Sequence, residues 1–137
     1  MGLLDGKVAI ITGAGGGLGE AYAKLFAREG AAIVVNDLGG PRDGSGGDKS
    51  MAQKVVDAIK AEGGRAVANG ADISTMAGAS AMVEHAVARF GGIDVLVNNA
   101  GIAQLDSTGS WNCTEEVLTM TPPPFSRIHL NTGWVQQ

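Results

Sequence analysis

The chain has 137 residues, of which 45% are hydrophobic and 18% charged, and its formal net charge is −4. This length and balance favour one globular domain with a packed core. The basic residues occur singly, which argues against a nucleic-acid partner. The sequence has no signal-peptide pattern and no apolar run of the roughly 20 residues that a membrane span needs, and its lone Cys113 cannot form an internal disulfide. We therefore expect a cytoplasmic protein with no membrane segment.

Short apolar runs alternate with helical apolar stripes along most of the chain. The expected strands are Lys7–Thr12, Ala32–Val35, Ala66–Ala68 and Ile93–Val97, and the expected helices are Gly17 to a stop at Gly30, Met51–Glu62 and Met76–Phe90. On the first helix we expect an inward stripe of Leu18, Ala21, Tyr22, Leu25 and Phe26. Four strands that alternate with three helices predict an α/β fold, with a parallel sheet and right-handed crossovers.

Two segments interrupt this alternation. Residues 39–47 are too rich in glycine for regular structure and predict a flexible surface loop, which is either a tolerated insertion or a neighbour of a ligand's adenosine end. Residues 102–137 hold only four charged side chains but eight Ser or Thr, so they differ in character from the rest. We expect a dinucleotide-binding half over residues 1–101 and a divergent tail over 102–137. The tail is expected to be partly helical or irregular, with short helices around Thr114 to Leu118 and near Phe125 to Trp134.

The turn from Thr12 to Gly19 joins the first strand to the first helix and holds five glycines in seven residues. Glycines let the backbone turn sharply and approach a pyrophosphate, while the N–H groups and dipole of the following helix favour negative charge. A plain tight turn does not need so many glycines, so the segment predicts phosphate binding. No Lys-Ser or Lys-Thr follows, which excludes the commonest nucleoside-triphosphate loop. A methyltransferase turn remains an alternative at this point.

Asp37 ends the second strand, 20 residues after Gly17. A carboxylate at this distance can accept hydrogen bonds from both hydroxyls of an adenosine ribose, which favours NAD as the cofactor. A 2′-phosphate would meet like charge there and would need an arginine. Arg42 is near in the sequence, but it belongs to the glycine-rich loop. The structural alternative for Asp37 is a residue that starts a turn.

The segment Asn98-Asn99-Ala100-Gly101 follows the fourth strand, and together with Thr12-Gly13-xxx-Gly17-x-Gly19 it resembles the short-chain dehydrogenase/reductase family. The resemblance covers residues 5–102 and implies a Rossmann-type doubly wound parallel sheet, truncated here to about four strands and their helices. The segment Val35 to Gly40 is similar to the D-3-hydroxyacyl-coenzyme A dehydrogenase branch, found in multifunctional β-oxidation enzymes. The resemblance thus favours a dehydrogenase over a methyltransferase.

The resemblance also implies roles for individual residues. Gly13, Gly17 and Gly19 would shape the pyrophosphate turn, with Leu18 against the cofactor. Asp37 would bind the ribose. The other implied cofactor contacts are Asp72 and Ile73 beside the adenine, and Asn99, Ala100 and Gly101, with Asn98, near the nicotinamide ribose. For Asn98 and Asn99 a purely structural role, in which their side chains tie adjacent strands, is an equal alternative.

No residue of this chain can be assigned to the catalytic residues of this family. Members use a serine and a tyrosine with a lysine four residues later, because a tyrosine of ordinary pKa near 10 is a poor base. The one tyrosine here, Tyr22, is followed by Phe26 at that position, and we expect it in the core. Either His129 or Asn131 could hold the place of a family asparagine. His85 is expected at the surface, Cys113 as a bystander, and no metal site is expected.

Two functions follow from the sequence. The first is an NAD-dependent oxidoreductase that acts on a secondary alcohol, such as a 3-hydroxyacyl thioester, with this chain lacking the catalytic half. The second is a non-catalytic NAD-binding or oligomerising module. In both cases we expect homo-oligomers, because a half-sheet with an open last strand invites association. A small-molecule substrate is expected for the full-length family.

Overall fold

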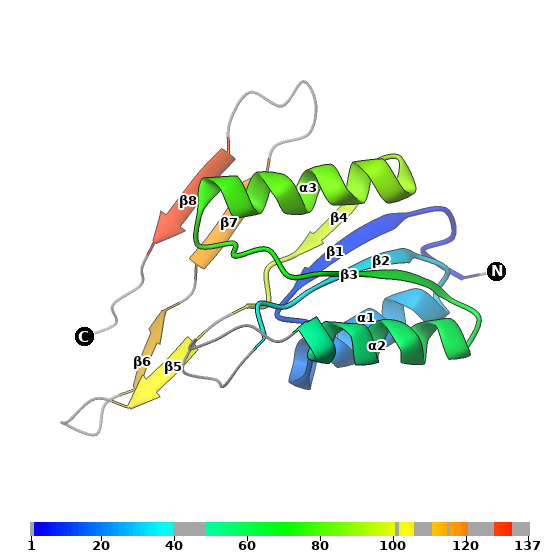
Figure 1. The fold of residues 1–137 in the computed structure, drawn as a ribbon, viewed down its shortest axis with the longest axis horizontal. Coiled ribbons are helices and arrows are strands. Elements are labelled where there is room, and N and C mark those ends of the chain that lie inside the picture. Colours follow the sequence, from blue (N-terminus) through cyan, green and yellow to red (C-terminus); the bar gives the residue numbers. More distant parts are fainter. Residues whose placement is uncertain are drawn as a thin grey trace.

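The computed structural model describes residues 2–39 and 49–100, without the side chains of residues 49 and 50, and the backbone of four later strands. The first four strands are β1 (Val8–Thr12), β2 (Ala32–Asn36), β3 (Arg65–Asn69) and β4 (Val95–Val97), and the helices are α1 (Gly17–Arg28), α2 (Lys49–Ala61) and α3 (Met76–Phe90). The four strands form one parallel sheet in the order β3-β2-β1-β4 (Figure 1). The predicted Rossmann-type α/β fold is confirmed.

Helices cover both faces of this sheet. The helices α1 and α2 lie on one face and α3 lies on the other (Figure 1). Every residue of β1 and β2 is buried, which explains why these strands are continuous apolar runs without polar alternation. The sheet side chains on the α1 and α2 side are Ala9, Ile11, Ile33, Val35 and Ala66, and those on the α3 side are Ile10, Val34 and Val67.

The face of α1 that packs on the sheet differs from the predicted stripe. Gly19 and Ala23 are its buried residues, and Phe26 and Ala27 pack against the same cluster. The exposed fractions of Leu18, Tyr22 and Leu25 are 67%, 37% and 51%, so the prediction that Tyr22 lies in the core is wrong. The small side chains let α1 lie close to the strands, which turns the larger side chains outward.

The ends of α3 coincide with the predicted ends because local signals set both. The N-cap residue Thr75 accepts a hydrogen bond from the Gly78 N–H at 3.0 Å, and Gly91 adopts a left-handed conformation with φ of 85° after the last turn. The strand β4 is shorter than predicted. Asp94 precedes it, and its carboxylate accepts a hydrogen bond from the Val8 N–H at 2.8 Å.

Residues after 101 form two antiparallel strand pairs where they are described. β5 (Ile102–Leu105) pairs with β6 (Trp111–Thr114), and β7 (Glu116–Met120) pairs with β8 (Ile128–Thr132). The two short helices predicted in this region are therefore wrong over the described residues. The sequence of β8 alternates apolar and polar side chains, which is the period of a strand rather than of a helix. Residues 40–48, which hold most of the predicted glycine-rich loop, lie outside the described residues.

Candidate functional site

The predicted site residues gather at one edge of the sheet. All four strands of the parallel sheet end there, and the turn between β1 and α1 lies at the same edge. Ligands of open parallel sheets bind outside the carboxyl ends of the strands. The topology thus brings the glycine-rich turn close to Asp37 and to the segment after β4.

The glycines of the turn allow close backbone contacts. Gly13 has a φ of 63°, and a Cβ atom there would lie 2.9 Å from the Cα atom of Ala100. At Gly19 a Cβ atom would clash with the Gly13 carbonyl oxygen and would lie 2.6 Å from Asn99 Nδ2. Gly17 has open space around it, but its φ of 57° favours glycine. The turn therefore needs glycine for close packing at Gly13 and Gly19, and for a positive φ at Gly13 and Gly17.

The N-terminus of α1 is open to a ligand. Its N-cap residue is Gly16, which has no side chain to cap the helix. Within residues 2–39 and 49–100, no hydrogen-bond acceptor faces the N–H groups of Gly17, Leu18 and Gly19. Unpaired N–H groups and the helix dipole together favour an anion at this position. The structure thus has the local features that a pyrophosphate site requires.

The Asp37 carboxylate lies against the glycine-rich turn. Its Oδ2 atom accepts a hydrogen bond from the Gly15 N–H, and its Oδ1 atom accepts one from the Gly39 N–H, both at 2.8 Å. A Cβ atom at Gly15 would lie 2.6 Å from Oδ2, so the contact depends on glycine there. Each carboxylate oxygen can accept more than one hydrogen bond. The Asp37 carboxylate can therefore still accept hydrogen bonds from ligand hydroxyl groups, while the turn fixes the orientation of the carboxylate.

The segment after β4 is tied to the end of β1. The Thr12 hydroxyl accepts hydrogen bonds from the N–H groups of Asn99 and Ala100, both at 3.0 Å, and donates to the Val97 carbonyl at 3.3 Å. The Asn99 side-chain amide donates to the carbonyl oxygens of Thr12 at 3.2 Å and Gly13 at 3.3 Å. The Asn99 amide therefore holds the turn in place. Gly101, predicted to belong to the site, lies outside the described residues.

Asp72 and Ile73 follow β3 and lead into α3. Asp72 is exposed, and its Oδ1 atom accepts hydrogen bonds from the Ser74 hydroxyl at 2.6 Å and from the Ser74 N–H at 3.0 Å. These bonds favour the ionised carboxylate and lower the pKa of Asp72 below its usual 3.8. Ile73 packs against the apolar cluster on the α3 side of the sheet. Asp72 thus orders the segment before α3, and Ile73 packs in the apolar cluster beside α3, both next to the predicted adenosine side.

Three polar side chains form a row across the sheet, and the sequence analysis named only Thr12 among them, as the start of the glycine-rich turn. Thr12, Asn36 and Asn69 end β1, β2 and β3, and they are paired in that order across the sheet. We call them the polar row. Thr12 and Asn36 are only 1% and 2% exposed, and Asn36 Nδ2 donates to Asn69 Oδ1 at 2.8 Å. The sequence signal that could have predicted this row is the polar residue at the end of each apolar run.

His85, which we expected at the surface, has a hydrogen-bond partner on the sheet. It is half-buried on α3, and its Nδ1 atom lies 3.0 Å from Asn69 Nδ2, within hydrogen-bond distance. Thus α3 contacts the end of the polar row. Over the described residues, no group of three or more His, Cys, Asp or Glu side chains could hold a metal ion.

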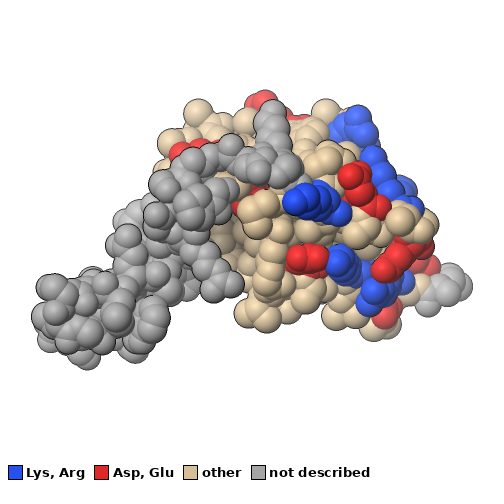
Figure 2. Space-filling view, turned by 60° about the horizontal axis from the view of Figure 1, so that its bottom comes forward, with Lys and Arg blue, Asp and Glu red and all other residues tan. Residues whose placement is uncertain are grey.

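Charged residues are mixed on the face of the molecule shown in Figure 2. Lys24 pairs with Glu20 at 2.6 Å, and Arg28 pairs with Glu62 at 2.9 Å. None of the helices in the described parts of the chain has the length and apolar character of a membrane span.

Comparisons with known proteins agree with this geometry. The family described as short chain dehydrogenase matches residues 7–121. The chain is 46% identical to the peroxisomal multifunctional enzyme type 2 of Drosophila melanogaster over 118 residues, which are 82% of this chain and 19% of that enzyme. It is 52% identical to the enzyme of the same name from Mus musculus over 98 residues, which are 72% of this chain and 13% of that enzyme.

Two solved structures have the same fold. A short chain dehydrogenase from Mycobacterium avium has 54% sequence identity and a TM-score of 0.67, over 75% of this chain and 37% of that one. A 7α-hydroxysteroid dehydrogenase, solved with NADH and 7-oxo glycochenodeoxycholic acid, has 44% identity and a TM-score of 0.64, over 72% of this chain and 35% of that one. The chain thus spans about a third of these structures and less of the multifunctional enzymes. It belongs to the short-chain dehydrogenase family, with relatives among the peroxisomal multifunctional enzymes.

Proposed function

We propose that this chain is the cofactor-binding part of an NAD-dependent oxidoreductase that acts on a secondary alcohol. The observation that carries the proposal is the contact between Asp37 and the glycine-rich turn. A hydrogen bond of 2.8 Å joins the carboxylate to the Gly15 N–H, beside an α1 N-terminus without a side-chain cap. A dinucleotide site needs both features together, because the carboxylate accepts hydrogen bonds from the ribose hydroxyls and the helix N-terminus binds the pyrophosphate.

We further propose NAD rather than NADP. A ribose 2′-phosphate would meet the negative charge of Asp37 at short range, and like charges in a partly buried site repel. The described partners of the Asp37 carboxylate are the N–H groups of Gly15 and Gly39, and Arg42 lies outside the described residues. This arrangement supports recognition of an unmodified ribose.

The substrate class is proposed from the resemblance to the hydroxyacyl dehydrogenase branch and from the names of the relatives. A 3-hydroxyacyl thioester carries a secondary alcohol. NAD held by the glycine-rich turn and Asp37 would supply the hydride acceptor for its oxidation, and the hydroxyl would lose a proton. Such a proton needs a base. In this chain Tyr22 lies on α1 with Phe26 four residues later, so it has no lysine partner at the family spacing.

We therefore expect no catalysis by the 137-residue chain alone. Purified protein given NAD and a 3-hydroxyacyl-coenzyme A should give no NADH absorbance above a control without protein. Enzymatic NADH production by this chain would contradict the expectation and would mean that another group serves as the base.

Two cellular compartments are proposed for the protein. The sequence leads us to expect the cytoplasm, and the names of the relatives suggest the peroxisome.

Cofactor binding can be tested by calorimetric titration with NAD and NADP. Asp37→Asn removes the charge but keeps the size of the side chain, and we expect NAD to bind roughly ten- to a hundredfold more weakly, as for the loss of hydrogen bonds to a charged group. The preference for NAD over NADP should fall. Asp57→Asn is a matched control, because Asp57 is exposed on α2 and contacts Gln53 instead of the turn. Equal NAD affinity for both variants would contradict the proposed role of Asp37.

The second candidate function is a non-catalytic module that associates through its open edge. The observation that favours it is the position of β4 at the end of the sheet, with its three residues only half-buried. The apolar side chains of Leu18, Tyr22 and Leu25 are also exposed on α1. Sedimentation velocity with and without NAD separates the two candidates. A dimer that binds no NAD would favour the second.

A further inference from the structure

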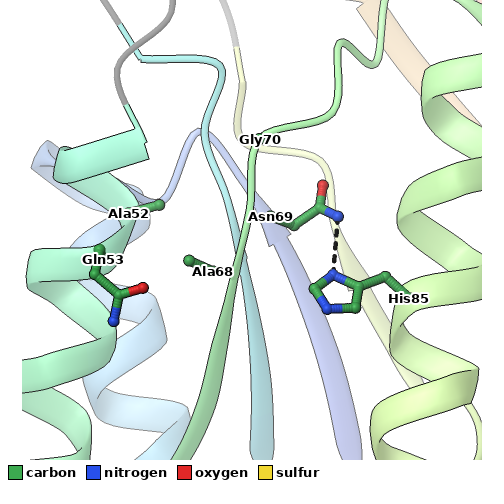
Figure 3. A pocket seen from close by; sticks show the side chains of 6 residues that line it. All are labelled: Ala52, Gln53, Ala68, Asn69, Gly70 and His85. Carbon is green, nitrogen blue, oxygen red and sulfur yellow. Dashed lines mark hydrogen bonds between the residues drawn. The ribbon is translucent and has the colours of Figure 1, made fainter.

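A cavity of about 280 Å³ lies at the outer edge of the sheet, where β3 is the last strand (Figure 3). Its lining comes from α2, α3 and the end of β3, and consists of Ala52, Gln53, Ala68, Asn69, Gly70 and His85. Asn69 points toward α3, where its amide meets the imidazole of His85, while Ala68 points toward α2 (Figure 3). None of the predicted site residues lines this cavity, yet Asn69 belongs to the polar row.

The hydrogen bonds of Asn69 fix the orientation of its amide. Its Oδ1 atom accepts from Asn36 Nδ2 at 2.8 Å and from the Ala71 N–H at 3.0 Å. Because two donors face this oxygen, a flipped amide would lose both bonds. The Nδ2 atom therefore donates to His85 Nδ1 at 3.0 Å, which places the ring proton of a neutral imidazole on Nε2. His85 thus braces the amide from the side away from the cofactor edge.

The amides of Asn36 and Asn69 together join two segments on the predicted adenosine side. Asn36 Nδ2 donates to the Ala71 carbonyl at 3.2 Å as well as to Asn69, so the end of β2 is tied to the loop that leads to Asp72. The Asp37 N–H donates to the Asn69 carbonyl at 3.0 Å. The Asn36 carbonyl accepts the Ala14 N–H of the glycine-rich turn at 2.9 Å. The backbone at Asn36 and Asp37 is therefore held to the end of β3 and to the glycine-rich turn.

We propose that Asn69, braced by His85, is a positioning residue for the adenosine half of the dinucleotide. The proposal rests on the proposed function, because it assumes that Asp37 receives the ribose. Without the amide, the ends of β2 and β3 lose their side-chain link. Asp37 and the loop after β3 then sample more conformations, and ligand binding has to restrict them again, which lowers affinity. His85 acts through Asn69 and does not touch the ligand.

Substitutions at His85 separate positioning from a general loss of structure. His85→Ala removes the acceptor and leaves Asn69 Nδ2 without its described partner. His85→Asn can restore the bond, because the side-chain oxygen of asparagine is attached to the same Cγ atom as Nδ1 of histidine. The matched control is Gln53→Ala, since Gln53 lines the same cavity but its amide donates to Asp57 at 2.8 Å instead.

The experiment is calorimetric titration of the full 137-residue chain and its variants with NAD, NADP and ADP-ribose. Because His85→Ala removes one neutral hydrogen bond, we expect it to bind NAD about threefold to tenfold more weakly. Asn69→Ala removes three, so it should weaken NAD binding at least as much. ADP-ribose should weaken by the same factor, since it contains the adenosine half. The preference for NAD over NADP should fall as well. His85→Asn and Gln53→Ala should bind within about twofold of the unchanged chain, a range below the smallest expected loss.

Each outcome bears on the proposal. Folded His85→Ala protein that binds NAD and ADP-ribose as tightly as the unchanged chain overturns it, and so does failure of His85→Asn to recover the lost affinity. A lower thermal midpoint with unchanged affinity would assign Asn69 and His85 a purely structural role. If Asn69→Ala does not fold, the two substitutions at the half-buried His85 decide the question. Absence of NAD binding by the unchanged chain would instead refute the proposed function and this inference together.

Discussion

Replacing Thr12 by valine should destabilise the protein although the two side chains have nearly the same shape. Thr12 is 1% exposed, and its hydroxyl accepts the N–H groups of Asn99 and Ala100 while it donates to the Val97 carbonyl. A buried donor that loses its acceptor costs about 1–3 kcal/mol, so two such donors cost about 2–6 kcal/mol. Valine suits a strand slightly better than threonine, which offsets a few tenths of a kcal/mol. We expect the free energy of unfolding to fall by about 3 kcal/mol.

The assay is urea unfolding followed by circular dichroism, with the midpoint compared at unchanged slope. Thr12→Ser keeps the hydroxyl and loses one methyl group, so it should cost only about 1 kcal/mol. Ile10→Val is the matched control for methyl removal, because Ile10 lies on the same strand and the same face and is expected to cost about 0.5–1.5 kcal/mol. If Thr12→Val proved as stable as Thr12→Ser, the hydroxyl would not be holding the segment after β4, and this reasoning would fail.

Three other outcomes are expected. Gly19→Ala puts a Cβ atom 2.6 Å from Asn99 Nδ2, so it should weaken NAD binding in calorimetry and lower the urea midpoint. Thr75→Ala removes the cap of α3 and should lower the free energy of unfolding in urea by about 1 kcal/mol, whereas an unchanged midpoint would show that the cap does not stabilise the protein. Ser74→Ala should raise the pKa of Asp72 toward 3.8 in an NMR titration. Because the folded pKa is the lower one, the Asp72 contribution to stability is present above about pH 3.8 and is lost as the pH falls through the folded value.

The parallel sheet could be predicted because its signals are local. Each strand is an apolar run, each crossover helix has periodic apolar residues, and glycines or a capping threonine mark the ends. The contact of Asp37 with the glycine-rich turn could be anticipated for a related reason, since a parallel topology places the ends of β1 and β2 side by side. These parts of the site follow from the order of elements and need no knowledge of side-chain packing.

The errors have physical causes that a linear sequence does not show. On α1 the larger apolar residues suggested the buried face, but the sheet accepts the small side chains of Gly19 and Ala23 instead. The sequence analysis assigned no role to Asn36 and Asn69, because they are 33 positions apart and their bond exists only after the sheet forms. The helix predicted near Phe125 to Trp134 is a different kind of error, because the alternation of polar and apolar residues in β8 is visible in the sequence and is typical of a strand.

The polar row also bears on how the strands find their alignment during folding. Strands that are apolar on both faces carry little information about register, because sliding one along another exchanges one apolar contact for another. Thr12, Asn36 and Asn69 end such strands and are paired at the same level. A slip of one residue would turn an asparagine side chain to the opposite face, into an apolar layer and away from its partner. The polar row, in which we propose that Asn69 positions a dinucleotide site, therefore also disfavours misaligned sheets.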